Sequence, residues 1–161
     1  MPLDSGLASI VTDCYFNLGQ MHQLGYGVDK DTRTSVRYYK KACSTGNHAQ
    51  AYTKCGDYYY SQRDKRSAMA CYKKAADFGD VMALNNIGLM LEQGYEDIAP
   101  QAEEALKMYK QAHNLGSLDA TLNLAIFYLS GKLVPIDQKV GKALLLKAHS
   151  QKSARAGEIM L

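Results

Sequence analysis

Residues 14–19 read CYFNLG, and the chain continues with YYKKA at residues 38–42 and with Gly46. The order is a small residue, a Leu four positions later, a Gly directly after it, and then Lys-Ala ahead of a closing Gly. Variants of this order return three more times in the 161 residues. The Leu position of each copy is held by Leu18, Cys55, Ile87 and Leu124, at intervals of 37, 32 and 37 residues. A period of about 20 to 50 residues indicates a solenoid of stacked repeats.

Each repeat contains two segments whose apolar residues are spaced as in a helix. Cys14, Leu18 and Met21 form one such stripe, and Val36 and Ala42 belong to another. Because neither helix can bury its stripe alone, we expect antiparallel helix pairs that stack on their neighbours. The expected helices span residues 8–24, 32–45, 48–61, 65–78, 80–93, 101–115, 117–130 and 138–150.

Helix boundaries are marked by cap residues and glycines. Asp31 and Asp137 are candidate N-caps, and Pro100 suits a first helical position. A glycine that tolerates left-handed backbone is expected where the second helix of each of the first three pairs ends, at Gly46, Gly79 and Gly116. The second repeat has only residues 61–63 between its two helices, which accounts for the shorter period.

The first repeat combines the small-x-x-x-Leu-Gly order, a Gly-x-Gly-Val loop at residues 25–28, an acidic cap and a Tyr-Tyr-x-Lys-Ala segment. This combination resembles the Sel-one-like repeats, which are relatives of the tetratricopeptide repeats, over roughly residues 10–150. The resemblance implies an all-α, right-handed α/α superhelix of about four antiparallel helix pairs. We expect repeats at about residues 14–50, 51–82, 83–119 and 120–150, with residues 151–161 as a capping helix or a truncated fifth repeat.

Similarity to tetratricopeptide repeats also implies a concave groove lined by the first helices. Its lining positions fall two residues before the Leu position and two, five and six residues after it, and the last of these places holds Leu24, Ser61, Gln93 and Ser130. From the other three places, the candidate partner-binding residues are Phe16, Gln20, Gln23, Thr53, Asp57, Tyr60, Asn85, Leu89, Glu92, Leu122, Ile126 and Leu129. We expect Tyr60 to be an affinity hot spot, because aromatic residues dominate binding energy at interfaces.

The fourth repeat differs from the others in offering an apolar shelf of Leu122, Ile126 and Leu129. Such a shelf is either an interface or a surface that a fifth repeat, or residues 159–161, would cover. A further recurrence is the Asn that precedes the Leu position in repeats one, three and four. We expect it to hydrogen-bond a neighbouring helix or loop, and contact with a peptide backbone is the alternative.

The sequence carries no pattern typical of a catalytic or metal site. Its four histidines lie more than 25 residues apart, with no second His or Cys at helical spacing, and no phosphate-binding glycine loop is present. His22 occupies the position that holds an aromatic or apolar residue in the other repeats, so we expect it to fill a packing slot. We therefore expect no enzyme activity, no cofactor, no metal ion and no small-molecule substrate.

The charged residues bear on two classes of partner, namely nucleic acid or another polyanion, and a protein or peptide. The net charge is only +3, and the recurring lysines and tyrosines of the second helices fall at equivalent places, which is typical of a solvated outer face. Binding of nucleic acid or another polyanion is therefore an alternative, and a non-catalytic scaffold or adaptor for a protein or peptide is the main expectation. A regulatory region of a larger multidomain enzyme is a further alternative. We expect a monomer, with self-association through the terminal repeats as the other option.

Cysteine usage bears on the compartment. A secreted branch of the similar family joins each helix pair through two Cys separated by seven residues, and no pair here has that separation. A bond between Cys55 and Cys71 is conceivable, but buried thiols in a reducing compartment are the preferred interpretation. No run of about 20 apolar residues and no signal peptide is found. We expect a cytoplasmic protein, or a secretory or periplasmic one if a signal peptide has been removed.

Overall fold

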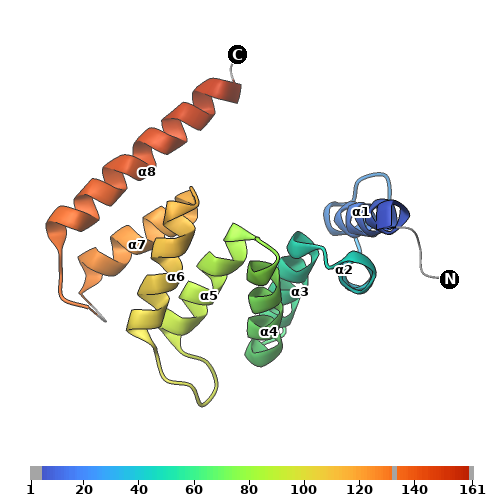
Figure 1. The fold of residues 1–161 in the computed structure, drawn as a ribbon, viewed down its shortest axis with the longest axis horizontal. Helices are drawn as coiled ribbons and strands as arrows, with labels where there is room; N and C mark the ends of the chain where they lie inside the picture. Colours follow the sequence, from blue (N-terminus) through green and yellow to red (C-terminus); the bar gives the residue numbers. More distant parts are fainter. Residues whose placement is uncertain (1–4, 132–133, 160–161) are drawn as a thin grey trace. The chain divides into compact units, whose positions relative to one another are not determined.

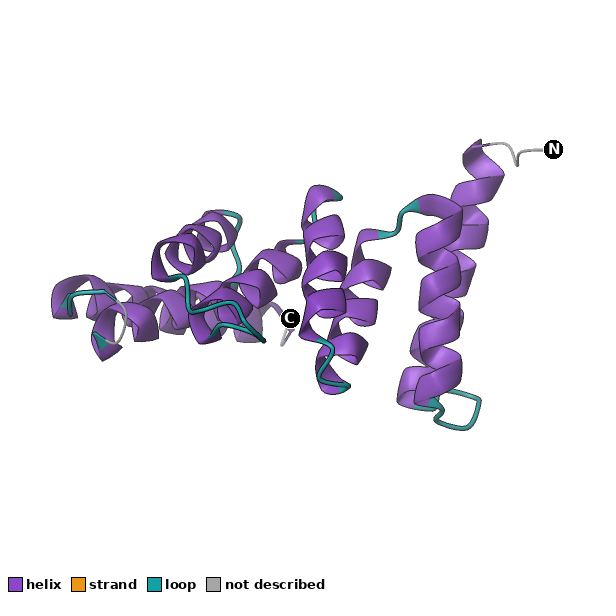
Figure 2. Ribbon diagram, turned by 90° about the horizontal axis from the view of Figure 1, so that it is seen from below, coloured by secondary structure: helices purple, strands orange, loops and turns teal. Residues whose placement is uncertain are grey.

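The computed structural model describes residues 5–131 and 134–159, with side chains described as far as Lys152. Every regular element in that part of the chain is a helix, as Figures 1 and 2 show, so the predicted all-α class is confirmed. The helices are α1 (Ser5–Leu24), α2 (Thr32–Gly46), α3 (Ala49–Ser61), α4 (Lys65–Asp77), α5 (Val81–Gln93), α6 (Ala102–Asn114), α7 (Leu118–Ser130) and α8 (Gln138–Ile159). Seven of the eight follow the predicted ranges closely.

The chain forms two compact units, Met1–Ala83 and Leu84–Leu161. In the first unit α1 packs on α2, α2 on α3 and α3 on α4. In the second unit α6 packs on α7 and α7 on α8, while Leu89 and Leu91 of α5 pack on the core around Tyr109 of α6. Each unit therefore contains consecutive helix pairs that are joined by short connections, as expected of stacked repeats.

A single backbone hydrogen bond closes the connection within every helix pair. The N–H of the residue before the second helix donates to the carbonyl of the residue four places after the Leu position. The four bonds run from Asp31 to His22 (2.9 Å), from Asp64 to Tyr59 (3.0 Å), from Gln101 to Leu91 (2.8 Å) and from Asp137 to Tyr128 (3.0 Å). The same bond is therefore present in all four connections although the loops between its ends differ in length.

The acidic caps lie where the sequence predicted them. The Asp31 carboxylate accepts from the backbone N–H groups of Arg33 and Thr34 at 2.9 and 3.3 Å, and Asp137 accepts from that of Val140 at 3.0 Å. The expectation for Pro100 is wrong, because α6 begins at Ala102 with Gln101 before it. Gln101 makes the loop-closing backbone bond, and this bond sets the start of α6 two residues after the proline.

The glycine that follows the Leu position gives room to a buried tyrosine of the second helix. A Cβ on Gly19, Gly56 or Gly88 would lie 2.5, 2.5 or 2.7 Å from a ring carbon of Tyr39, Tyr72 or Tyr109. These three rings are almost completely buried. In the fourth repeat the residues at these sequence positions are Ala125 and Leu145, and Leu145 is 39% exposed rather than buried. The Gly of the Leu-Gly segment and the buried Tyr of the second helix therefore form a packing pair.

Two of the three closing glycines have the backbone that was predicted. Gly79 and Gly116 have φ values of 90° and 87°, whereas Gly46 is the last residue of α2 and the left-handed residue is Asn47, with φ of 53°. Gly46 is required for another reason, since a Cβ there would overlap the Thr12 side chain.

The last helix is longer than predicted. Helix α8 continues without a break from Gln138 to Ile159, whereas the sequence placed its end near residue 150. Gly141 and Ala148 are buried. A capping or fifth-repeat role for residues 151–161 stays a prediction, and Met160, Leu161 and the side chain of Ile159 lie outside the described residues.

Candidate functional site

The position two residues before the Leu position packs one repeat on the next. Phe16, Thr53 and Asn85 were predicted to line the groove, but only 7, 3 and 7% of their surface is exposed. The Phe16 ring stacks on His48, which caps α3, with 4.2 Å between ring centroids. These three residues therefore offer almost no surface to a ligand in this structure, and we correct their assignment.

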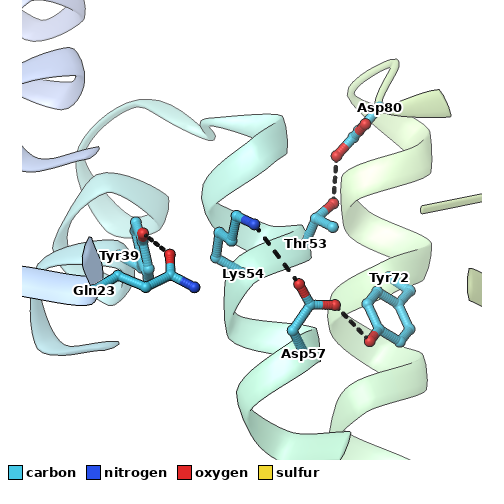
Figure 3. Close-up of polar contacts among 7 residues, drawn as sticks. All are labelled: Gln23, Tyr39, Thr53, Lys54, Asp57, Tyr72 and Asp80. Carbon is cyan, nitrogen blue, oxygen red and sulfur yellow. Dashed lines mark hydrogen bonds and ion pairs between the residues drawn. The ribbon is translucent and has the colours of Figure 1, made fainter. Parts of the chain in front are cut away.

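The other two buried residues also make contacts toward the following repeat. The Thr53 hydroxyl donates to the Asp80 carboxylate, next to the start of α5 (Figure 3). Asn85 accepts a hydrogen bond of 2.9 Å from the Asn123 side-chain amide of α7. Asn123 is one of the recurring asparagines, so in this repeat the expected bond to a neighbouring helix is confirmed. Leu122, which holds the same position in the last repeat, is 37% exposed.

Two positions of the first helix remain accessible in every repeat. They lie two and five residues after the Leu position, and we call them, together with Leu122, the first-helix face of their unit. In the first unit this face consists of Gln20, Gln23, Asp57 and Tyr60, and in the second unit of Leu89, Glu92, Leu122, Ile126 and Leu129. Tyr60 and Ile126 are the most exposed large side chains among them, at 38 and 57%. The accessible part of the predicted site is thus polar in one unit and mainly apolar in the other.

Buried tyrosines of the second helices support the polar residues of the first-helix face. The hydroxyl of Tyr39 donates to Gln23 Oε1 at 2.6 Å, and that of Tyr72 donates to Asp57 Oδ1 at 2.9 Å (Figure 3). In the second unit Tyr109 donates to Glu92 Oε2 at 2.7 Å. A side chain already held in one rotamer loses less conformational entropy when it binds a partner.

The hydrogen bonds that these tyrosine hydroxyls donate to the first-helix face were not predicted from the sequence. The recurring tyrosine was correctly interpreted as a packing residue, but its hydroxyl also reaches the accessible face. Two features of the sequence could have predicted these bonds. They are the constant spacing between the tyrosine and the following Ala, and the polar residue on the first helix.

Asp57 is the charged centre of the face in the first unit. Loss of solvation raises the pKa of its carboxyl, and this effect is opposed by the Tyr72 hydrogen bond and by Lys54, whose Nζ lies 4.0 Å from Oδ2 (Figure 3). Burial also raises the pKa of the Tyr72 and Tyr109 phenols above the ordinary value. These phenols therefore remain protonated donors at neutral pH.

The opposite, second-helix side carries lysines that lie over tyrosine rings. Lys40 lies 5.0 Å from the Tyr59 ring centroid of the following repeat, and Lys110 lies 6.0 Å from that of Tyr128. At the next position along the helix, Lys41 lies over Tyr15 at 5.2 Å and Lys74 over Tyr52 at 5.5 Å. Such contacts are favourable cation–π interactions. Because these rings are already covered by lysines of the same chain, they are poor candidates for stacking nucleic-acid bases.

From the sequence, His22 and the cysteines were expected to be packing residues. His22 stacks on Tyr38 with 5.6 Å between centroids, in the slot predicted from the sequence. Within residues 5–131 and 134–159 no three His, Cys, Asp or Glu side chains are arranged to hold a metal ion. None of the described helices has the length and apolar character needed to cross a bilayer. All four cysteines are free, and Cys14 is exposed, contrary to the expectation of buried thiols.

Comparison with known proteins gives matches along nearly the whole chain. A family model described as the Sel1 repeat matches residues 12–47, 49–80, 81–117 and 118–157. The sel1-like repeat-containing protein L21 of Acanthamoeba polyphaga mimivirus is 27% identical over 122 residues, which are 75% of this chain and 22% of that protein. The chain therefore spans about a fifth of that relative.

Solved structures with a similar fold include the following three. A Sel1 repeat protein from Oxalobacter formigenes has a TM-score of 0.76 at 28% identity, covering 86% of this chain and 58% of that one. The antigen c5321 of uropathogenic Escherichia coli, described as displaying an SLR fold, has a TM-score of 0.76 at 25% identity, covering 85 and 30%. MamA, at 15% identity, a TM-score of 0.63 and coverages of 91 and 81%, shares the fold.

Proposed function

The chain belongs to the Sel1 repeat family, and we propose that it is a scaffold or adaptor that binds a protein or peptide on its first-helix faces without chemistry of its own. The observation that carries this proposal is the exposure pattern of the first helices. The same two positions stay accessible in four successive repeats, while the position two residues before the Leu position is buried in three of them. Within each unit, such equivalent, accessible side chains suit recognition of an extended segment rather than of a small molecule.

The two units offer different chemistry to such a partner. The face of the first unit presents the Gln20 amide, the Asp57 carboxylate and the Tyr60 ring, which suit hydrogen-bonding and basic groups. The face of the second unit presents Leu122 and Ile126, which suit apolar side chains. We propose that the partner carries a polar or basic segment for the first unit and an apolar segment for the second.

Tyr60 is the proposed anchor of the first unit. Its ring is 38% exposed, and Lys65 lies 5.8 Å from the ring centroid on one side. An aromatic side chain that acts as a hot spot near the centre of an interface typically costs about 2 kcal/mol or more of binding free energy when it is truncated to Ala. Replacing Tyr60 with Ala should therefore weaken partner binding by roughly 30-fold or more without changing helicity.

The test is a pull-down with the full chain and two matched variants. One variant replaces Gln20, Asp57 and Tyr60 with Ala, and the control replaces the exposed second-helix residues Arg37 and Lys73 with Ala. We expect a protein recovered with the wild type and the control but lost with the first variant. Loss with both variants, or retention with both, would contradict the proposal.

We also propose that the protein acts in a reducing compartment, the cytoplasm being the simplest. The support is the burial of Cys43 and Cys55 in a core cluster with Phe16 and Tyr39, without a disulfide. Alkylation of thiols at the moment of cell lysis, followed by mass measurement of the denatured protein, should count four thiols. Two alkylated thiols or none would indicate an oxidising compartment.

A further inference from the structure

Three thiols from consecutive helices of the first unit line one cleft. Cys43 belongs to α2, Cys55 to α3 and Cys71 to α4. The cleft has a volume of about 310 Å³, and Tyr52 and Lys40 are among its other lining residues. A space of this size is comparable to small-molecule pockets. The cleft thus brings nucleophilic side chains together in a place that a small reagent can enter.

Cys43 and Cys55 lie in the same part of the core. Both are buried members of one core cluster, and both line the cleft. Cys71 is partly buried and packs against that cluster, whereas the exposed Cys14 is not among the residues that line the cleft. Two cysteines on consecutive helices that line the same cleft can be joined once their side chains adopt disulfide geometry.

We propose that Cys43 and Cys55 are a modification site, at which they form a disulfide with each other when a low-molecular-mass disulfide such as oxidised glutathione enters the cleft. Such a bond would join the second helix of the first repeat to the first helix of the second repeat. It therefore differs from a bridge between the two helices of one pair, such as the Cys55–Cys71 bond considered from the sequence.

The chemistry is thiol–disulfide exchange in two steps. The thiolate of one cysteine attacks a sulfur of the reagent, which forms a mixed disulfide and releases one reduced thiol. The second cysteine then attacks the protein sulfur of that mixed disulfide and releases the second reduced thiol. In total two protein thiols are oxidised, one reagent disulfide is reduced to two thiols, and the protons of the protein thiols are transferred to the released thiolates.

The surroundings make this exchange slow. The neighbouring Cys43 thiol and burial both raise the pKa of the Cys55 thiol, and burial raises the pKa of Cys71 to about 11. Lys40 opposes these shifts, as does Lys74 at Cys71. Because the thiolate is the attacking species, we expect the exposed Cys14 to react with the reagent before the cleft does.

The experiment is incubation of the reduced full chain with oxidised glutathione, followed by acid quenching, alkylation and non-reducing peptide mapping by mass spectrometry. We expect a peptide linking residues 43 and 55, and a thermal midpoint higher by about 5 °C that returns to its initial value with a reductant. Cys71→Ser should keep the link, Cys43→Ser should lose it, and Cys14→Ser should remove only the glutathione adduct at residue 14.

The proposal would be overturned by a link between residues 55 and 71, by stable glutathione adducts on residues 43 or 55 without a link, or by four unlinked cysteines after prolonged incubation. Because the mapping is done on the wild-type chain, none of these outcomes depends on a variant that fails to fold.

Discussion

The ring of Tyr109 lies directly against Gly88, so that a Cβ at position 88 would come within 2.7 Å of a ring carbon. Replacing Gly88 with Ala should therefore destabilise the second unit by about 1–3 kcal/mol, because the buried ring has to move. The measurement is the free energy of unfolding from denaturant titration. Gly6→Ala is the control, since a Cβ at Gly6 meets no atom within 4 Å.

A smaller residue at position 109 should rescue the same variant. In the fourth repeat Ala125 aligns with Gly88, whereas Leu145, which aligns with Tyr109 in the sequence, is 39% exposed. The double variant Gly88→Ala, Tyr109→Leu should lose less stability than the sum of the two single variants, because Leu leaves room for the added methyl group. Additive losses would show that the ring contact is not what requires a glycine.

Phe16 and Gln20 were both predicted to line the groove, but in the structure Phe16 is buried and Gln20 is partly exposed. Replacing the buried Phe16 with Ala should cost about 3–5 kcal/mol of stability. Replacing the partly exposed Gln20 with Ala should change stability by no more than about 0.5 kcal/mol. Thermal unfolding followed by circular dichroism separates the two, and equal losses would contradict the assignment of Phe16 to the junction between repeats.

His113 should make the second unit sensitive to acid. Its Nδ1 lies 2.7 Å from Thr121 Oγ1, and its Nε2 lies 3.1 Å from Lys147 Nζ. Because the Thr121 hydroxyl donates to the Ser117 carbonyl, we assign the His113 proton to Nδ1, which leaves Nε2 to accept from Lys147. Burial, and then the Lys147 charge, lower the pKa of His113 from its ordinary value of 6.5.

The lowered pKa of His113 determines how the stability of the fold changes with pH. The folded state binds a proton on His113 less readily than the unfolded state, so this contribution to stability is complete above about pH 6.5 and is lost as the pH falls through the lowered pKa. The thermal midpoint should drop less for His113→Gln than for the wild type between about pH 7.5 and pH 5. The exposed His149, replaced with Gln, is the control and should behave as the wild type does.

The repeated phrase predicted most of the fold because each of its parts has a local physical cause. Asp31 and Asp137 cap their helices because a carboxylate directly before a helix accepts hydrogen bonds from its first N–H groups. The recurring Tyr of the second helix is buried because it lies on the apolar stripe of that helix. The wrong assignment of Pro100 came from a rule about first helical positions that ignores the backbone bond made by Gln101. The extent of α8 could not be predicted, because nothing in residues 150–153 resembles a stop signal or a continuing apolar stripe.

The binding site was predicted less completely. Its lining positions were taken from similarity to another repeat class, and the position of Phe16, Thr53 and Asn85 is buried here by the start of the following repeat or by a bond to its first helix. How closely successive repeats approach depends on side-chain volumes at the junction, which a spacing pattern does not contain. The hydroxyl support of Asp57 and Glu92 depends in the same way on contacts between helices.

The claim that the first-helix face binds a partner is tested most directly by photo-crosslinking in cells. A photoreactive phenylalanine analogue placed at Tyr60 should give a crosslinked species with one protein, and the same analogue placed at Lys73 on the second-helix side should not. The crosslink should also disappear when Asp57 and Gln20 are replaced with Ala. Crosslinking at position 73 with none at position 60 would contradict the account.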